Sequence, residues 1–209
     1  MERIIAKELL SIGAVFLRPE QPFTWASGIK SPIYCDNRLT LSAPSVRAKI
    51  EDGLAGLVRK YYPQCEMLMG TSTAGIAHAA ITATILGLPM GYVRGEAKTH
   101  GRTNRIEGKM EPGTKVVVIE DLISTGGSAI EVVEALREEG ADVLGIVSIF
   151  TYGMKKGLER IAAANTENHS LSNLDALVEV AVEEGYIAPE WKDRIIAFRN
   201  NPSDESWIK

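Results

Sequence analysis

Two adjacent carboxylates follow an apolar run near the middle of the chain, and a segment rich in glycine and hydroxyl groups comes directly after them. The run is Val116 to Ile119, the acids are Glu120 and Asp121, and the segment ends at Ser128 within VVVIEDLISTGGSA. Glycines let several backbone N–H groups converge, hydroxyls add donors, and a helix that begins here adds partial positive charge. The segment after the acids therefore predicts an anion site suited to a phosphate group.

The two acids need a different partner, because carboxylates beside a phosphate would repel it. They are accounted for if sugar hydroxyl groups, or a metal ion, lie against Glu120 and Asp121 while the phosphate lies over the loop that follows. This arrangement suggests a phosphorylated sugar as the ligand. The simpler alternative is that Asp121 caps a turn, Glu120 is solvated and Ser128 only caps the next helix.

A second polar segment is strongly basic, although the chain has a formal net charge of −4. Between Arg94 and Lys109 there are five lysines and arginines but only two glutamates, and His100 adds a further nitrogen donor. The segment lacks apolar periodicity and contains three glycines, which predicts a mobile loop over residues 94–110 that becomes ordered over an anion. An ordinary solvated loop is the alternative.

The elements around these segments alternate between helix and strand from about residue 42, which predicts an α/β fold with a central, mostly parallel sheet flanked by helices. Strands are expected at 67–70, 88–94, 116–119 and 143–150. In an open sheet of this kind, ligands bind beyond the carboxyl ends of the strands. Glu120 and Asp121 would lie at such an end.

We expect one domain over residues 1–209. Residues 1–41 start with an amphipathic helix and continue as strand-like, turn-rich sequence, which predicts a small N-terminal lobe. Residues 42–155 are expected to form the α/β core. Residues 156–209 contain helical stretches, one of them capped by Ser172, which should pack on the edge and face of that core.

Composition restricts the class of protein. Hydrophobic residues make up 45% of the chain and charged residues 24%, as in an ordinary globular protein. No apolar run approaches the length of a membrane-spanning helix, and the acidic balance argues against a nucleic-acid-binding protein. The two cysteines, Cys35 and Cys65, fit a reducing cytoplasm. Dinucleotide, Walker A, nucleophile-elbow and zinc-protease motifs are absent.

The stretch Val116 to Ala129 resembles the phosphoribosyl pyrophosphate (PRPP) binding motif of type I phosphoribosyltransferases. Val93 to Gly113 resembles the mobile catalytic loop of the orotate phosphoribosyltransferase family, and Phe23 to Arg38 resembles the N-terminal hood that covers the base in that family. The resemblance spans most of residues 1–155. It implies the type I phosphoribosyltransferase fold and the Mg²⁺-dependent transfer of the 5-phosphoribosyl group from PRPP to orotate. The products would be orotidine 5′-monophosphate and pyrophosphate, in the biosynthesis of UMP.

The same resemblance implies roles for individual residues. Glu120 and Asp121 would hold the ribose hydroxyls. The remaining PRPP-binding residues would be Leu122, Ile123, Ser124, Thr125, Gly126, Gly127 and Ser128, which take the 5-phosphate, and Arg94, Lys98 and His100, which take the pyrophosphate. The residues implied for orotate are Ser124, Ser27, Gly28 and Lys30.

Catalysis would depend on Lys98, His100 and Arg94, because fixed cations stabilise the charge that builds up on departing pyrophosphate. Lys98 is expected to be the principal cation, with His100 as a supporting donor. The family implies a Mg²⁺ ion held mainly by PRPP and water, without direct protein ligands. It also implies a cytoplasmic homodimer in which the loop reaches the partner's site, with no nucleic acid and no membrane as partners.

The chain departs from many relatives at the base site. It has Ala26 where they have a lysine in the hood, and the strand after the acidic motif ends in FTYGMKK without an arginine. Hood backbone N–H groups, Lys30, Arg38 or Lys155 are the candidate substitutes. Two other functions stay open: the same transfer to a purine base, and a PRPP-sensing regulator without catalysis.

Overall fold

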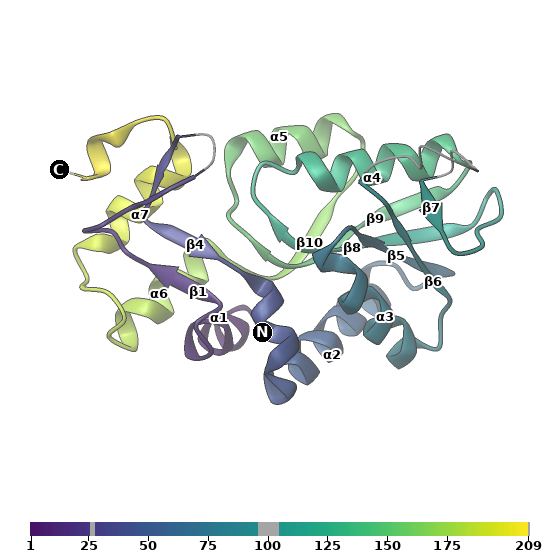
Figure 1. Cartoon of the computed structure of the whole chain (residues 1–209), viewed down its shortest axis with the longest axis horizontal. Coiled ribbons are helices and arrows are strands. Elements are labelled where there is room, and N and C mark those ends of the chain that lie inside the picture. Colours follow the sequence, from purple (N-terminus) through teal and green to yellow (C-terminus); the bar gives the residue numbers. More distant parts are fainter. Residues whose placement is uncertain (26–27, 96–104, 209) are drawn as a thin grey trace.

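The computed structural model describes residues 1–25, 28–95 and 105–208, so the predicted site residues Ser27, Lys98 and His100 lie outside the described residues. A six-stranded sheet forms the centre of the molecule, in the order β10-β9-β8-β5-β6-β7 (Figure 1). All neighbouring strands in it are parallel except the pair β6–β7, which confirms the predicted sheet. Its strands are β5 (Met67–Thr71), β6 (Met90–Val93), β7 (Ile106–Glu107), β8 (Lys115–Ile123), β9 (Asp142–Thr151) and β10 (Asn168–Asn173).

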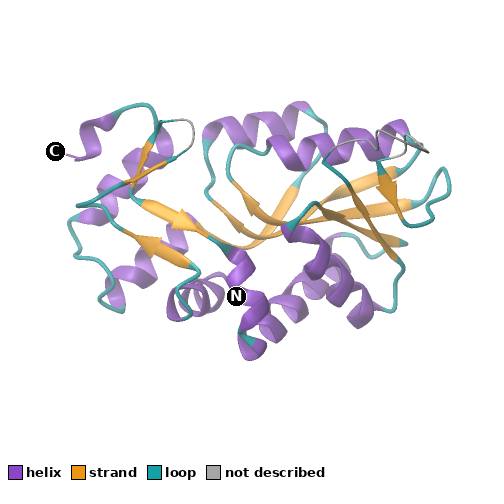
Figure 2. Ribbon diagram, in the orientation of Figure 1, coloured by secondary structure: helices purple, strands orange, loops and turns teal. Residues whose placement is uncertain are grey.

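Helices cover both faces of the sheet (Figure 2). Helices α2 (Pro44–Tyr61) and α3 (Ala74–Leu86) lie on one face, and α4 (Gly127–Glu138) and α5 (Lys155–Ala163) lie on the other (Figure 1). Side chains of β8 alternate between the two layers, because Val117 and Ile119 belong to one core cluster while Val116 and Val118 belong to the other. Burial on both faces explains why this strand is a continuous apolar run in the sequence.

The N-terminal lobe, which contains the segment that resembles a hood and is called the hood below, forms one end of the molecule. Helix α1 (Glu2–Ser11) precedes strand β1 (Val15–Leu17), which pairs antiparallel with β4 (Ile33–Cys35). Between them, β2 (Phe23–Thr24) pairs with β3 (Lys30–Ser31), and a 3-10 helix η1 (Asn37–Ser42) connects β4 to the core. Gly28 adopts φ +85° in the turn between β2 and β3, a conformation that favours glycine.

The end of the chain packs beside this hood, at the same end of the molecule (Figure 1). It comprises α6 (Leu174–Glu183), α7 (Trp191–Asn200) and a short 3-10 helix η2 (Glu205–Ile208). Arg3 of α1 forms ion pairs with Glu179 and Glu183, and the Lys7 Nζ atom lies 2.6 Å from Glu184 Oε1. The ring centroid of Trp25 lies 5.7 Å from that of Phe198. Residues from both ends of the chain therefore build one lobe.

Two local predictions were wrong. The expected Ser172 cap does not exist, because Ser172 lies in strand β10 and its hydroxyl donates to the Glu2 carbonyl at 2.9 Å. The side chain of Asn173 caps α6 instead, accepting from the Ala176 amide at 2.9 Å. Strand β8 also continues to Ile123, so that the acid pair lies among the last four residues of the strand and not after it. No helix in the described parts of the chain is long and apolar enough to cross a membrane.

Candidate functional site

The acid pair lies near the carboxyl end of β8, as the sequence predicts, but its two members differ in environment. Glu120 is 4% exposed, whereas Asp121 is partly exposed. The Thr71 hydroxyl donates to Glu120 Oε1 at 2.8 Å, and the Asp121 backbone amide donates to the same oxygen at 2.9 Å. The Ser128 hydroxyl lies 3.4 Å from Glu120 Oε2. Glu120 is therefore fixed by neighbours and is not the solvated side chain of the simpler alternative.

Burial raises the pKa of Glu120 to about 8, and the neighbouring Asp121 carboxylate adds to the shift, against the opposing hydrogen bond from Thr71. A carboxyl group with such a pKa holds a proton near neutral pH. One protonated and one ionised carboxyl group can together donate to and accept from a pair of adjacent hydroxyl groups. This property suits a diol better than it suits a phosphate.

The raised pKa of Glu120 predicts a particular dependence of stability on pH. The folded state keeps this proton up to about pH 8, while the unfolded state loses it near the ordinary glutamate value, so the stability contributed by Glu120 falls as pH rises between the two values. Glu120→Gln should therefore stabilise the protein at pH 8.5, on the order of 2 kcal/mol, and change little at pH 4. Urea unfolding at both pH values measures this difference. Glu131→Gln, on the exposed side of α4, is the control, and an equal effect of Glu120→Gln at both pH values would contradict the assignment.

The loop after β8 presents unpaired backbone donors. Within the described structure, the amides of Ser124, Thr125 and Gly126 donate to no other residue. Gly126 adopts φ +71°, which turns the chain directly into α4 at Gly127. Free amides at the start of a helix, together with the helix dipole, form the anion site that the sequence predicts.

Helix α5 supports this loop from behind. A Cβ atom added to Gly157 would lie 2.5 Å from the Ser124 carbonyl oxygen, so the helix backbone approaches the loop as closely as a glycine allows. The Arg160 Nη1 atom donates to the Thr125 carbonyl at 3.1 Å. These contacts direct the loop carbonyls toward α5, and they place a guanidinium group next to the predicted phosphate site.

The two ends of the basic loop are joined by hydrogen bonds where the loop leaves the sheet. The Arg94 amide donates to the Arg105 carbonyl at 2.9 Å, and Arg105 Nε donates to the Arg94 carbonyl at 3.2 Å. The Arg94 Nη1 atom lies 3.6 Å from Glu107 Oε1. Binding of pyrophosphate by Arg94 would thus require the guanidinium to exchange a protein carboxylate for the ligand.

A cleft of about 490 Å³ lies between the hood, the end of the chain and the loop after β8 (residues 124–126), which we call the phosphate loop after its predicted ligand. Of the candidate cations for the base, Lys155 lines it, whereas Lys30 Nζ donates to the Thr24 hydroxyl at 2.8 Å and Arg38 pairs with Asp36. Its lining residues are Trp25, Ile29, Thr125, Met154, Lys155, Lys156, Glu159, Arg199, Asn200, Pro202 and Ser203.

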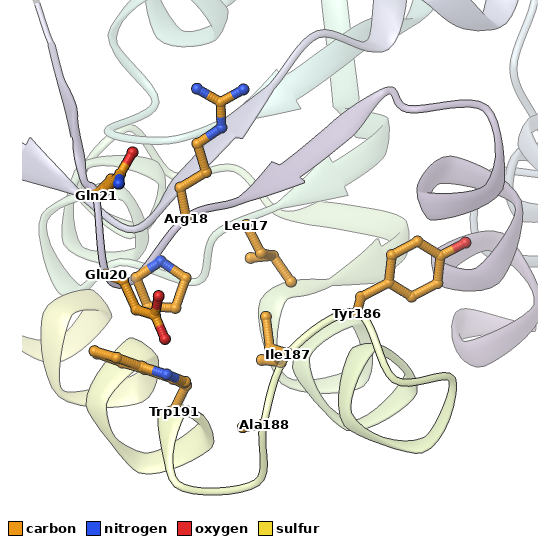
Figure 3. A pocket seen from close by; sticks show the side chains of 9 residues that line it. Leu17, Arg18, Glu20, Gln21, Tyr186, Ile187, Ala188 and Trp191 are labelled. Carbon is orange, nitrogen blue, oxygen red and sulfur yellow. The ribbon is translucent and has the colours of Figure 1, made fainter.

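A second cavity of about 350 Å³ lies in the lobe built from the two ends of the chain (Figure 3). Figure 3 shows Arg18, Glu20 and Trp191 around it, and Tyr186 and Ile187 from the segment before α7. It shares no lining residue with the acid pair or the phosphate loop. We therefore do not assign PRPP to it.

Two residues at the acid pair were missed by sequence reasoning. Thr71 comes from the end of β5 and Asn37 from the start of η1, where the Asn37 Nδ2 atom donates to the Asp121 carbonyl at 2.7 Å. His78 of α3 lies apart from this site and is a packed histidine, since it is fully buried with Nδ1 2.6 Å from Glu51 Oε1. His169 lies in β10, within residues 156–209 where only helical stretches were expected, and its ring is stacked on Tyr61.

Comparison with known proteins agrees with this geometry. Residues 41–181 match the family described as Phosphoribosyl transferase domain, so the fold and the site define a phosphoribosyltransferase. An orotate phosphoribosyltransferase of Bacillus cereus (strain G9842) is 59% identical over 208 residues, covering 100% of this chain and 99% of the relative. The chain belongs to the orotate phosphoribosyltransferase family.

Solved structures agree as well. The crystal structure of orotate phosphoribosyltransferase from Aeropyrum pernix has a TM-score of 0.75 at 29% identity and covers 88% of this chain and 99% of its own. The UMP synthase of Leishmania donovani has a TM-score of 0.80 at 26% identity, and the match covers 94% of this chain but 42% of that longer chain. The predicted fold class and the predicted family are both confirmed.

Proposed function

We propose that this protein catalyses the Mg²⁺-dependent transfer of the 5-phosphoribosyl group from PRPP to orotate, giving orotidine 5′-monophosphate and pyrophosphate in pyrimidine biosynthesis. Membership of the orotate phosphoribosyltransferase family supports the overall reaction. The observation that carries it structurally is the pair Glu120 and Asp121 next to a loop with free amides at Ser124 to Gly126. Such a pair and loop can receive the diol and the phosphate of one phosphorylated sugar.

This placement supports roles for individual residues. We propose that Glu120 and Asp121 bind the ribose hydroxyls and that the loop from Leu122 to Ser128 binds the 5-phosphate. The Ser128 hydroxyl lies near Glu120 and would contact phosphate only after turning away from that carboxyl group. The backbone amides of the loop are therefore the main phosphate donors in this proposal.

Displacement of pyrophosphate from the ribose carbon builds negative charge on the leaving group. We propose Lys98 as the principal cation that stabilises it, with His100 and Arg94 in support. Mg²⁺, when bound, would neutralise further charge on the pyrophosphate. The described residues contain no group of three or more His, Cys, Asp or Glu side chains that could hold a metal ion. We therefore propose that PRPP and water supply most of its ligands, with the acid pair binding the sugar hydroxyls beside it.

We propose the cleft between hood and phosphate loop as the site of orotate. Orotate is anionic, and Lys155, Lys156 and Arg199 outnumber the one acidic lining residue, Glu159. We also propose that Ser124, Ser27, Gly28 and Lys30 contact the ring from the loop and the hood. Ser124 and Gly28 do not line the cleft themselves, but each directly precedes a residue that does, Thr125 and Ile29. Within the described chain the Lys156 ammonium has no ion-pair partner, whereas Lys155 lies 3.7 Å from Glu159 and Arg199 pairs with Asp175. Lys156 is thus the cation most readily available to a carboxylate.

One assay tests the reaction and the acceptor together. The protein is mixed with Mg²⁺ and PRPP, and the change in ultraviolet absorbance is followed with orotate, with purine bases or without a base. We expect turnover only in the mixture that contains orotate. Turnover with a purine and none with orotate would refute the acceptor, and binding of PRPP without turnover of any base would favour a regulator.

We further propose that the protein acts in the cytoplasm as a homodimer, each chain a single domain, with the loop from one chain completing the partner's site. Mixing Lys98→Ala with Asp121→Asn chains should then restore part of the activity, because one of the two hybrid sites has both residues intact. Activity of mixed and unmixed variants measures this rescue, and native mass spectrometry verifies the heterodimer. Verified heterodimers without activity would show that the loop serves its own chain.

A further inference from the structure

The end of β8 lacks a strand neighbour on one side. The last registered pair between β5 and β8 is Gly70 with Ile119, while on the other side the pairing of β8 with β9 continues to Ile123 and Thr151. In the described structure Asp121 has no registered partner in β5 or in β9, so the hydrogen bonds of its backbone must come from elsewhere.

Side chains replace the missing strand there. The Thr71 hydroxyl lies 3.3 Å from the Ile119 carbonyl oxygen. Two residues further along β8, Asn37 Nδ2 donates to the Asp121 carbonyl at 2.7 Å. The Asp121 backbone amide donates a hydrogen bond to Glu120 Oε1. Asn37 comes from the hood side of the molecule, separated from the end of β4 by Asp36, and lies 84 positions before Asp121. The acid pair is therefore anchored to the hood as well as to the sheet.

The amide of Asn37 has one defined orientation. The residue is fully buried, the Cys35 thiol donates to its Oδ1 atom at 3.3 Å, and the Thr40 hydroxyl donates to its backbone carbonyl. With Oδ1 accepting from the thiol, Nδ2 is turned toward Asp121. Burial raises the pKa of the Cys35 thiol, which keeps the thiol proton in place as a donor. Asn37 is thus a rigid link from β4 to the end of β8.

We propose that Asn37 is a positioning residue for phosphoribosyl transfer, which fixes the distance between the hood and the acid pair. The proposal rests on the proposed function, in which ribose lies on the acids and the base lies under the hood. The reacting carbon and the attacking nitrogen then belong to groups held on opposite ends of the Asn37 link. A small error in this distance is costly, because transfer requires the two atoms in near-attack geometry.

The test compares Asn37→Ala with Ser31→Ala. Ser31 is also fully buried in the hood, and its hydroxyl donates to the Ile33 carbonyl at 2.7 Å without touching the acid pair. Each variant removes two buried hydrogen bonds of the replaced side chain, so similar losses in the thermal midpoint are expected. We expect Asn37→Ala to lower kcat about ten-fold at a temperature well below its midpoint, and Ser31→Ala to change kcat less than about two-fold. Equal kcat in the two variants overturns the proposal.

A double-mutant cycle separates positioning from general loosening. If Asn37 acts through Asp121, Asn37→Ala should lower kcat less than about two-fold in an Asp121→Asn background, because that background already lacks the positioned carboxylate. The same ten-fold loss in both backgrounds would contradict the proposal. If Asn37→Ala does not fold, Cys35→Ala carries the test, since it frees the amide to turn. Lower kcat then supports the link, and unchanged kcat refutes it.

Failure of the underlying function gives a different result. If the wild-type protein does not turn over PRPP with orotate, or if Asp121→Asn retains full kcat, the proposed function of the acid pair fails before Asn37 is considered. If both behave as expected and Asn37→Ala matches Ser31→Ala, only the positioning role fails.

Discussion

Replacement of Lys98 with alanine is expected to lower kcat by about 10²- to 10³-fold, while the dissociation constant for PRPP changes much less. A fixed cation that meets charge mainly as it develops on the leaving group stabilises the transition state more than the bound substrate. Lys98 lies outside the described residues, and the expectation rests on the basic character of residues 94–110 and on the family resemblance. Steady-state kinetics and calorimetric titration with PRPP give the two quantities.

Lys109→Ala is the matched control for this prediction. Lys109 belongs to the same basic segment, but its side chain is 90% exposed and its Nζ atom lies 2.9 Å from Glu111 Oε1. Its loss should change kcat less than about two-fold, because an exposed ion pair contributes little. Equal losses in the two variants would mean that the segment acts through its summed charge, and an unchanged kcat in Lys98→Ala would remove Lys98 from catalysis.

Gly157→Ala is expected to raise the KM for PRPP about ten-fold or more and to lower the thermal midpoint by about 5 °C. The new Cβ atom would lie 2.5 Å from the Ser124 carbonyl oxygen and 3.5 Å from the Thr125 carbonyl carbon. Both neighbours are backbone atoms, so either α5 or the phosphate loop has to move. Displacement of the loop changes where its free amides point, and these amides are the proposed phosphate donors. Kinetics at varied PRPP and differential scanning calorimetry measure the two effects.

Gly56→Ala provides the comparison for Gly157→Ala. Gly56 is also a helical glycine, within α2, but a Cβ atom built there has no neighbour within 4 Å. The substitution should leave KM unchanged and stabilise the helix by up to about 1 kcal/mol, because alanine loses less backbone entropy on folding. If Gly157→Ala behaved in the same way, close packing of α5 would have no part in shaping the loop.

The sheet and the acid pair could be predicted because their signals are local. Val116 to Ile119 lie in a strand buried on both faces, which produces an unbroken apolar run. The loop that follows carries the glycines and hydroxyls that are typical of an anion site. Helix α3 has an equally local signal, since its apolar residues end at Gly87 with φ +66°. In these segments the chemistry of each residue agrees with its immediate neighbours in the chain.

The missed features depend on partners that are distant in sequence. Strand β10 contains mostly polar residues and one fully apolar side chain, Leu171, and it forms because β9 offers a free edge. Its hydroxyls find partners across the sheet, as with Ser148 and Ser170, whose oxygens lie 2.6 Å apart. The bond from Asn37 to Asp121 is similar, because nothing near Asn37 in the sequence indicates that its amide will complete the edge of a strand.

The lobe built from both ends of the chain has a consequence for synthesis of the protein. Arg3 and Lys7 pair with residues that follow them by more than 170 positions, and Trp25 packs on Phe198. Contacts of such high sequence separation form late in folding, and on the ribosome they cannot form until α6 and α7 have emerged. The α/β core can thus assemble around the loop after β8 while the lobe beside the proposed acceptor site is still incomplete. A nascent chain arrested before residue 174 should therefore form the proposed ribose-phosphate site without a complete lobe of α1, α6 and α7.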